Sequence, residues 1–141
     1  MERRDFIRLS LTGVGASIIA PQALAETEKQ TIITSDIYYT EQSPGRWSGK
    51  VATHLPTIEA TKEGEKTIIK VVTAHEMKGY EHYIVKHVLL DKDYKYLDEH
   101  LFNPQEDKAA LSLFTLKNYS GVLYALSLCN KHDLWLNRTD I

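Results

Sequence analysis

The chain has 141 residues, a formal net charge of −2 at pH 7 and a single cysteine. This length allows one domain with a modest core, and one cysteine excludes an intramolecular disulfide. The slight excess of acidic residues argues against nucleic acid or an anionic membrane surface as a partner.

The N-terminal segment 1–25 is typical of an export signal. It begins with the paired arginines Arg3 and Arg4, continues with a weakly apolar run over 9–20, and ends in Ala-Leu-Ala. The apolar run is too short to span a bilayer comfortably, and the last three residues suit a signal peptidase. The segment resembles a twin-arginine (Tat) signal, although an ordinary Sec signal or an uncleaved anchor would share several of these features. We therefore expect a periplasmic domain at 26–141, with no stable membrane insertion after cleavage.

The rest of the chain predicts short strands separated by turns. Strand-like segments, rich in β-branched, aliphatic and aromatic residues, occur at 31–40, in two arms of a hairpin at 55–75, and at 82–91, 109–116 and 122–129. Segment 41–50 contains Pro44 and two glycines and is predicted to be a loop, and 96–107 is predicted to be irregular. The last two strand-like segments flank the turn at 117–121 and are predicted to form a second hairpin. Six or seven such strands favour an all-β fold, an antiparallel β-sandwich.

Six histidines are present, and four of them stand at predicted strand ends or in loops: His54, His75, His82 and His132. Ligands often converge at such positions from separate parts of a rigid sandwich. His75 and His82 are separated by a segment that contains Gly79, so a loop can bring both side chains to one site. His87 and His100 have no comparable context and are predicted to be surface or core residues.

The only cysteine, Cys129, lies three residues before His132 near the C-terminus. This spacing allows both side chains to reach one ion around a tight turn. A lone thiol is a liability in an oxidising compartment, and metal binding as a thiolate would protect it. One sulfur with four imidazole nitrogens differs from structural zinc sites, which usually have four ligands and more cysteines; imidazole suits iron, and a thiolate tunes it.

Three stretches, "THLPTIE", "HEMKGYEHYIVKHVLL" and "CNKHDLW", occur in an order that resembles the iron-binding domain of superoxide reductases, the desulfoferrodoxin and neelaredoxin group. The resemblance covers roughly residues 46–137. It implies a seven-stranded immunoglobulin-like antiparallel β-sandwich and a mononuclear non-haem iron (Fe2+/Fe3+). The four histidines named above would be the equatorial ligands, and Cys129 the axial thiolate that pushes electron density toward an open sixth position.

The resemblance implies a superoxide reductase, an oxidoreductase that reduces superoxide to hydrogen peroxide by one electron and is re-reduced by an external electron donor. One-iron relatives are often tetramers, so a homo-oligomer is compatible with this reading. Two competing hypotheses remain at the level of sequence. One is a periplasmic iron-binding electron-transfer protein without superoxide chemistry, and the other is a non-enzymatic β-sandwich module with a vestigial or zinc site.

The sequence departs from the family pattern near the expected site. The usual Glu-Lys before the first histidine is Ala52-Thr53 here, so the lysine expected to attract superoxide is missing. Lys50 is a candidate substitute, as are Lys78 and Lys131. Asp133 replaces a glycine and Glu76 a proline, and both add negative charge where an anion should be attracted. We therefore expect slower superoxide reduction than in relatives that carry the lysine.

Overall fold

The computed structural model describes residues 35–141. The predicted export signal at 1–25 and the start of the predicted strand at 31–40 lie outside these residues. Seven strands form two antiparallel sheets, after a 3-10 helix η2 (Gly45–Lys50) and one α-helical turn α2 (Val51–His54). Within the described chain, no helix is long and apolar enough to cross a membrane.

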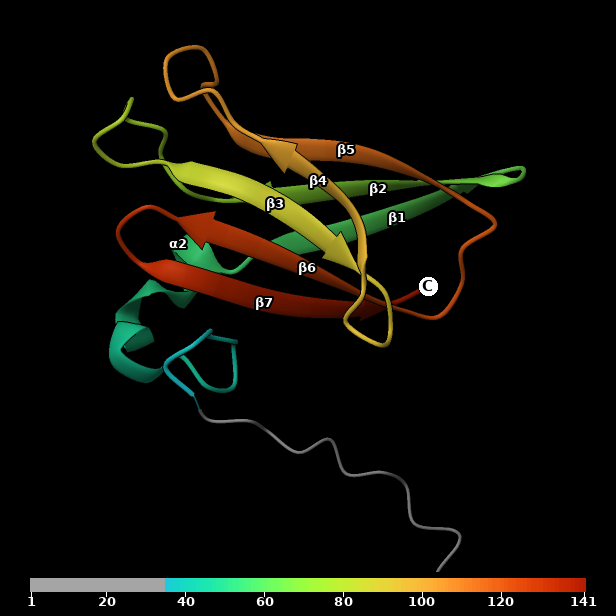
Figure 1. Ribbon diagram of the computed structural model, residues 1–141, viewed down its shortest axis with the longest axis horizontal. Coiled ribbons are helices and arrows are strands. Elements are labelled where there is room, and N and C mark those ends of the chain that lie inside the picture. Colours follow the sequence, from blue (N-terminus) through green and yellow to red (C-terminus); the bar gives the residue numbers. More distant parts are fainter. Residues whose placement is uncertain (1–34) are drawn as a thin grey trace, which may run out of the picture. The chain divides into compact units, whose positions relative to one another are not determined.

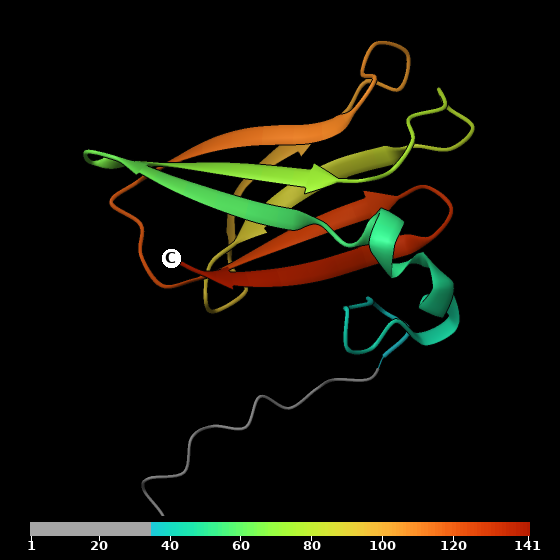
Figure 2. The same ribbon diagram turned by 180° about the vertical axis from the view of Figure 1, so that it is seen from behind.

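The two sheets face each other as an immunoglobulin-like sandwich (Figure 1, and from behind in Figure 2). One sheet has the order β1-β2-β5, and the other has the order β4-β3-β6-β7. The strands are β1 (Thr57–Glu63), β2 (Lys66–Thr73), β3 (Ile84–Leu90), β4 (Tyr96–Leu101), β5 (Ala110–Lys117), β6 (Val122–Cys129) and β7 (Asp133–Asp140). The predicted fold class, a seven-stranded antiparallel β-sandwich, is confirmed.

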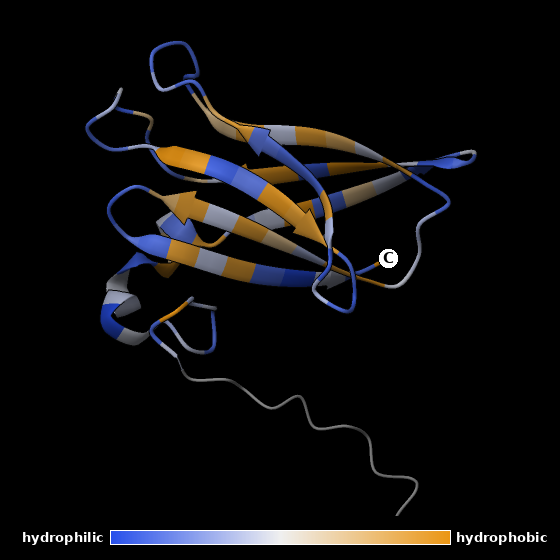
Figure 3. Cartoon of the chain, in the orientation of Figure 1, coloured by the Kyte–Doolittle hydropathy of each residue, from blue (hydrophilic) through white to orange (hydrophobic). Residues whose placement is uncertain are grey.

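Alternating burial along the strands builds the core. Every second residue of β2, β5 and β6 is buried, and Figure 3 shows the corresponding hydrophobic bands along the strands. The main cluster between the sheets comprises Ile69, Val71, Leu89, Phe114, Leu123 and Ala125. A second cluster comprises Ile84, Phe102, Ala110 and Cys129, with Met77 packed against it. The only cysteine is therefore part of the hydrophobic packing at one end of the sandwich.

A small polar network lies inside this core. His87 on β3 is fully buried; its Nδ1 lies 2.7 Å from the Ser112 hydroxyl and its Nε2 lies 2.8 Å from the Thr73 hydroxyl. Thr73 also bonds Ser127 at 2.8 Å, so the network joins β2 and β5 of one sheet to β3 and β6 of the other. Burial lowers the pKa of His87 to about 3, with a smaller contribution from the nearby charge of His100. His87 is thus a core histidine and His100 an exposed one, as predicted.

The hairpin predicted at 55–75 is confirmed as β1 and β2, with Gly64 in the left-handed conformation (φ 65°) at its turn. The second predicted hairpin is wrong, because β5 pairs with β2 whereas β6 pairs with β3 and β7. The loop at 117–121 therefore crosses from one sheet to the other. Turn residues show where a chain reverses direction, and which strand each arm then pairs with depends on the packing of the two sheets.

Three further predictions of local structure are wrong. The segment predicted to be irregular, 96–107, contains β4, an edge strand that pairs only with β3 and is too exposed to show alternation. Within the described part of 31–40, only an isolated bridge forms, between Tyr39 and Trp135. The predicted loop at 41–50 includes η2, which is too short to produce a helical period. The strand β7 is missing from the sequence prediction, because its two buried residues, Trp135 and Leu136, are adjacent and give no alternation of buried and exposed positions.

Candidate metal centre

The structure brings together the five predicted ligand residues from separate elements. His54 ends α2, His75 follows β2, His82 precedes β3, Cys129 ends β6, and His132 lies in the turn before β7. One donor atom from each of them lies within 4.8 Å of all the others. The segment between His75 and His82 turns at Gly79 (φ 56°), which allows their Nε2 atoms to lie 3.0 Å apart.

The four imidazoles are arranged as a square. Neighbouring ring centroids are 4.4 to 5.0 Å apart, whereas the diagonal pair His54 and His82 is 6.3 Å apart. The nitrogen–nitrogen distances along three sides are 3.0, 3.1 and 3.2 Å. An ion at the centre of such a square would be about 2.2 Å from each nitrogen, close to the usual length of an imidazole–metal bond, ~2.0–2.1 Å for zinc. The spacing therefore fits a single first-row metal ion.

Hydrogen bonding does not explain these short contacts. The Nδ1 atom of His132 has three donor-atom neighbours, at 3.1, 3.2 and 3.6 Å. A neutral imidazole nitrogen carries either one proton or one lone pair, so it cannot bond to three partners at once. Lone pairs directed at a common centre are the arrangement that a metal requires.

Backbone carbonyls fix the tautomers of two of the imidazoles. Nδ1 of His54 lies 3.1 Å from the carbonyl oxygen of Lys50 and 2.8 Å from the hydroxyl of Thr53, and Nδ1 of His75 lies 2.5 Å from the carbonyl oxygen of Glu76. Because a carbonyl only accepts hydrogen bonds, each Nδ1 carries the proton, and each Nε2 presents a lone pair to the centre. Such contacts orient ligand rings before a metal binds.

All four imidazoles favour the neutral form that binds metals. Burial lowers the pKa of His54 to about 4, and the nearby His75 contributes a smaller effect. Burial is also the largest cause of the lowered pKa values of His75, His82 and His132. Protonating four adjacent rings would place several positive charges side by side and would remove the lone pairs that bind a metal. The neutral rings are therefore suited to sharing one metal cation.

The Cys129 thiol is buried beside the four imidazoles, whereas a pocket open to solvent reaches three of them. Cys129 is buried, and its Sγ lies 3.7 Å from Nε2 of His75 and 3.6 Å from Nδ1 of His132. An open pocket of about 360 Å³ reaches three of the imidazoles and does not include Cys129; its lining residues are Lys50, Thr53, His54, Ala74, His75, Glu76 and His82. The thiol thus comes from the protein interior, while a small molecule can reach the imidazoles from solvent.

Two residues next to the ligands hold the surrounding loops. The side chain of Asn130 accepts a hydrogen bond from the amide of Tyr83 and donates to the carbonyls of Tyr80 and Glu81, so it fixes the loop that carries His82. Trp135 Nε1 donates to the carbonyl oxygen of His132 at 2.9 Å.

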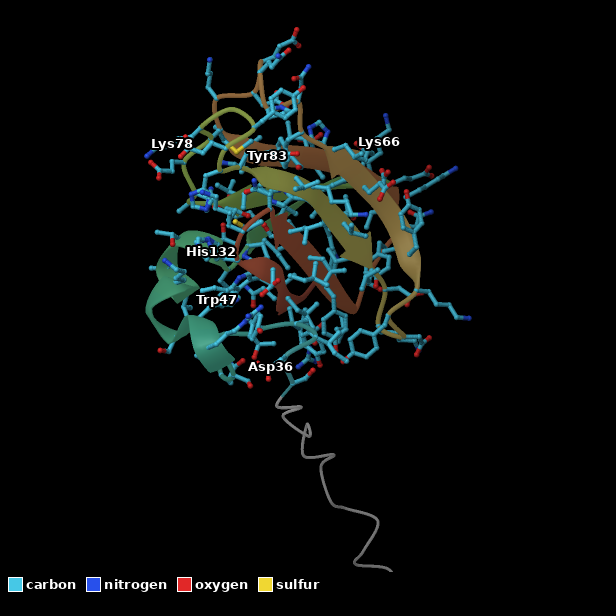
Figure 4. The ribbon with its side chains drawn as sticks, turned by 60° about the vertical axis from the view of Figure 1, so that its left-hand side comes forward. Asp36, Trp47, Lys66, Lys78, Tyr83 and His132 are labelled. Atoms are coloured by element: carbon cyan, nitrogen blue, oxygen red, sulfur yellow. The ribbon has the colours of Figure 1, made fainter. Side chains whose placement is uncertain are left out.

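The added carboxylates have cationic partners, which sequence reasoning missed. Asp133 lies 2.5 Å from Arg46, and Glu76 lies 3.3 Å from Lys78. The hydrogen bond from Trp47 and the contact with Arg46 hold the pKa of Asp133 below its usual value. Lys50 lines the pocket and makes no ion pair with any residue in 35–141. Figure 4 shows Trp47, His132 and Lys78 along one edge of the sandwich.

Comparison with known proteins agrees with this geometry. The family model for desulfoferrodoxin matches residues 46–138. The superoxide reductase (neelaredoxin) from Ignicoccus hospitalis is 31% identical, covers 74% of this chain and 94% of its own, and has a TM-score of 0.62. A variant of that protein is also 31% identical, with 77% and 98% coverage and a TM-score of 0.65. The superoxide reductase from Nanoarchaeum equitans, at 23% identity, 74% and 99% coverage and a TM-score of 0.58, shares the fold.

No curated protein matches the chain. The matched family and the cluster of four histidines and one cysteine identify mononuclear non-haem iron as the cofactor, as the sequence predicted. With a family model spanning most of the described residues, this chain belongs to the desulfoferrodoxin family.

Proposed function

We propose that this protein is a superoxide reductase, which converts superoxide to hydrogen peroxide with one electron and two protons. The observation that carries the proposal is an open pocket that reaches three of the four clustered imidazoles, with a buried thiol beside the cluster. The similar superoxide reductases from Ignicoccus hospitalis support the same activity. We assign His54, His75, His82, His132 and Cys129 as the ligands.

When bound, ferrous iron supplies the electron, and an external donor must restore it after each turnover. The chain supplies the surroundings of this chemistry. Cys129 would hold the iron as a thiolate, a strong donor that would favour loss of an electron from the iron. The imidazoles remain neutral, and the pocket admits a small anion from solvent.

Lys50 is the residue that we assign to attract superoxide. It is half-buried, lines the pocket, and its positive charge lowers the pKa values of His54, His75 and His132. Lys78 is engaged by Glu76, and Lys131 acts on His82 and His132 from a position outside the pocket lining. An ammonium group near the pocket raises the local concentration of an anion and offers a proton to the product.

The competing hypothesis of an electron carrier without superoxide chemistry predicts that small molecules cannot reach the metal centre from solvent. The pocket beside the three imidazoles argues against it. Azide or cyanide should therefore shift the absorption spectrum of the ferric protein, and an unchanged spectrum would favour the carrier. The N-terminal sequence supports export by the Tat pathway to the periplasm, and we propose that location.

Pulse radiolysis of the iron-loaded, ferrous protein tests the activity directly. Each superoxide pulse should produce stoichiometric ferric thiolate absorption, with hydrogen peroxide and no oxygen as products. If the iron is bound through Cys129 but is not oxidised by superoxide, the protein is not a reductase.

Charge at the pocket should set the association rate with superoxide. Thr53→Lys adds an ammonium group to a residue that lines the pocket, so the second-order rate constant should rise by a factor of about 3 to 10 and depend more steeply on salt. Lys50→Ala should lower the rate constant by a similar factor. Both are measured by pulse radiolysis at several ionic strengths.

Lys66→Ala is the matched control, because Lys66 begins β2 at the end remote from His75 and lies on the far side of the domain from His132 in Figure 4. It should leave the rate and its salt dependence unchanged. Equal effects of Lys66→Ala and Lys50→Ala would mean that only net charge matters and would remove the specific role of Lys50.

A further inference from the structure

Segments that are distant in the sequence meet at the carboxylate of Asp133. Its Oδ2 accepts a hydrogen bond from Trp47 Nε1 at 2.8 Å and another from Arg46 Nη2 at 2.5 Å. The Arg46 guanidinium also lies over the Trp47 ring, 4.7 Å from its centroid, and its Nε donates to the buried Tyr39. We call Arg46, Trp47 and Asp133 the clamp, because they tie η2 to the first residue of β7.

Asp133 has a backbone conformation that glycine would adopt at lower cost, and its side chain forms the hydrogen bonds that offset this cost. This residue has φ 67°, a left-handed conformation that costs a residue with a side chain about 1 kcal/mol or more and that glycine adopts freely. Aspartate tolerates the conformation better than most residues, and here its carboxylate receives two hydrogen bonds. A residue with no side chain would relieve the backbone but would leave Trp47 and Arg46 without their acceptor.

The clamp acts on one side of the metal centre. The Trp47 ring meets the His132 ring edge-on, with centroids 4.8 Å apart and an interplanar angle of 85° (Figure 4). His54 and His75 are oriented by hydrogen bonds from Nδ1 to carbonyls, whereas Nε2 of His132 has no hydrogen-bond partner within 35–141. Besides the edge-on contacts with His54 and His82 inside the cluster, packing against Trp47 is the aromatic contact that limits rotation of the His132 ring.

We propose that Trp47, held in place by Asp133 and Arg46, is a positioning residue for His132 and thereby increases the affinity of the centre for iron. The proposal rests on the iron-binding part of the proposed function and does not require superoxide chemistry. It also explains how Asp133 is accommodated beside a site for an anion, because its charge is engaged by Arg46.

The release of ferrous iron to a strong chelator tests the clamp. Trp47→Ala should release iron about 10 to 100 times faster than the wild type, the usual effect of removing a group that orients a metal ligand. Trp47→Phe keeps an aromatic ring against His132 and should recover most of the wild-type rate. Asp133→Asn keeps the left-handed backbone and an oxygen acceptor but loses the charge, so it should fall between them. The ferric absorption maximum and the melting temperature are recorded for each variant.

Glu99→Gln is the matched control, because it removes a carboxylate from the ion pair between Lys86 and Glu99, on the paired strands β3 and β4. It should leave iron release unchanged. If Trp47→Ala lowers the melting temperature but releases iron at the wild-type rate, the clamp is merely structural and the proposal is wrong. Equal losses in Trp47→Phe and Trp47→Ala would overturn it as well. Wild-type protein that retains iron but does not react with superoxide would refute the proposed reductase alone.

Discussion

Replacing Cys129 with serine should abolish the ferric thiolate absorption and slow superoxide oxidation of the ferrous protein by a factor of at least about 100. The hydroxyl of serine is close to the thiol in size but is a poor donor, so it cannot supply the thiolate's electron density. Cys129 also belongs to the buried cluster with Ile84, Phe102 and Ala110. The measurements are the absorption spectrum of the iron-loaded protein and pulse radiolysis, with circular dichroism to verify folding.

Cys129→Ser removes the sulfur and also buries a hydroxyl in an apolar cluster, so a control variant must separate the two effects. Ala110→Ser places a hydroxyl in the same apolar cluster but replaces no ligand residue, so it should destabilise the fold by about 1–2 kcal/mol and leave the absorption band intact. If Cys129→Ser retained wild-type kinetics, the sulfur would not be a ligand that matters for the reaction.

Acid should destabilise the protein through His87. Its folded-state pKa of about 3 lies below the ordinary value of 6.5, so the folded state favours the neutral ring. The part of the free energy of unfolding that depends on neutral His87 is fully present above about pH 6.5. It is lost as the pH falls toward 3, by about 1.4 kcal/mol for each pH unit. His87→Gln should lower the free energy of unfolding at pH 7 by about 1–3 kcal/mol, because the bonds to Thr73 and Ser112 are disturbed. It should also flatten the decline between pH 6 and 4.5.

The measurement is urea unfolding of the metal-free protein across that pH range, which avoids linkage to iron. His100→Gln changes an exposed histidine and should leave the slope with pH unchanged. The clustered histidines also respond to acid in the metal-free protein, so only part of the decline should disappear in His87→Gln. Parallel pH profiles for the wild type and His87→Gln would show that His87 makes no contribution to it.

The sequence carried enough information for the fold class and the residue types of the metal centre. Segments 67–74 and 122–129 are rich in β-branched and aliphatic residues, which predicts strands locally, whereas the alternation of buried and less buried positions along them is seen only in the structure. The loop at Gly79, a left-handed position in the structure, was also visible in the sequence as a turn signal. In the same way, Cys129 and His132 are close enough in sequence for one turn to bring them together, and their chemistry follows from their side chains.

The sequence alone was less informative where neighbours decide the outcome. The edge strand β4 buries too little to leave a pattern, and the segments flanking 117–121 pair with strands elsewhere in the chain. Nothing in the residue types indicated that Asp133 would meet Arg46 or that Glu76 would meet Lys78. Their negative charges were therefore expected to repel an anion, whereas the structure gives each a cationic partner.

By itself, then, the sequence predicted the ligand residues of the centre and the strand-rich segments of the sandwich, and it showed Thr53 where relatives carry a lysine. Only the tertiary structure decided that four imidazole nitrogens form a square with sides of about 3.1 Å, because their positions depend on how two sheets pack. The same packing placed Trp47 against His132 and left Lys50 at the pocket. Residue type is a local property, whereas the distance between residues such as 54 and 132 is set by every contact in between.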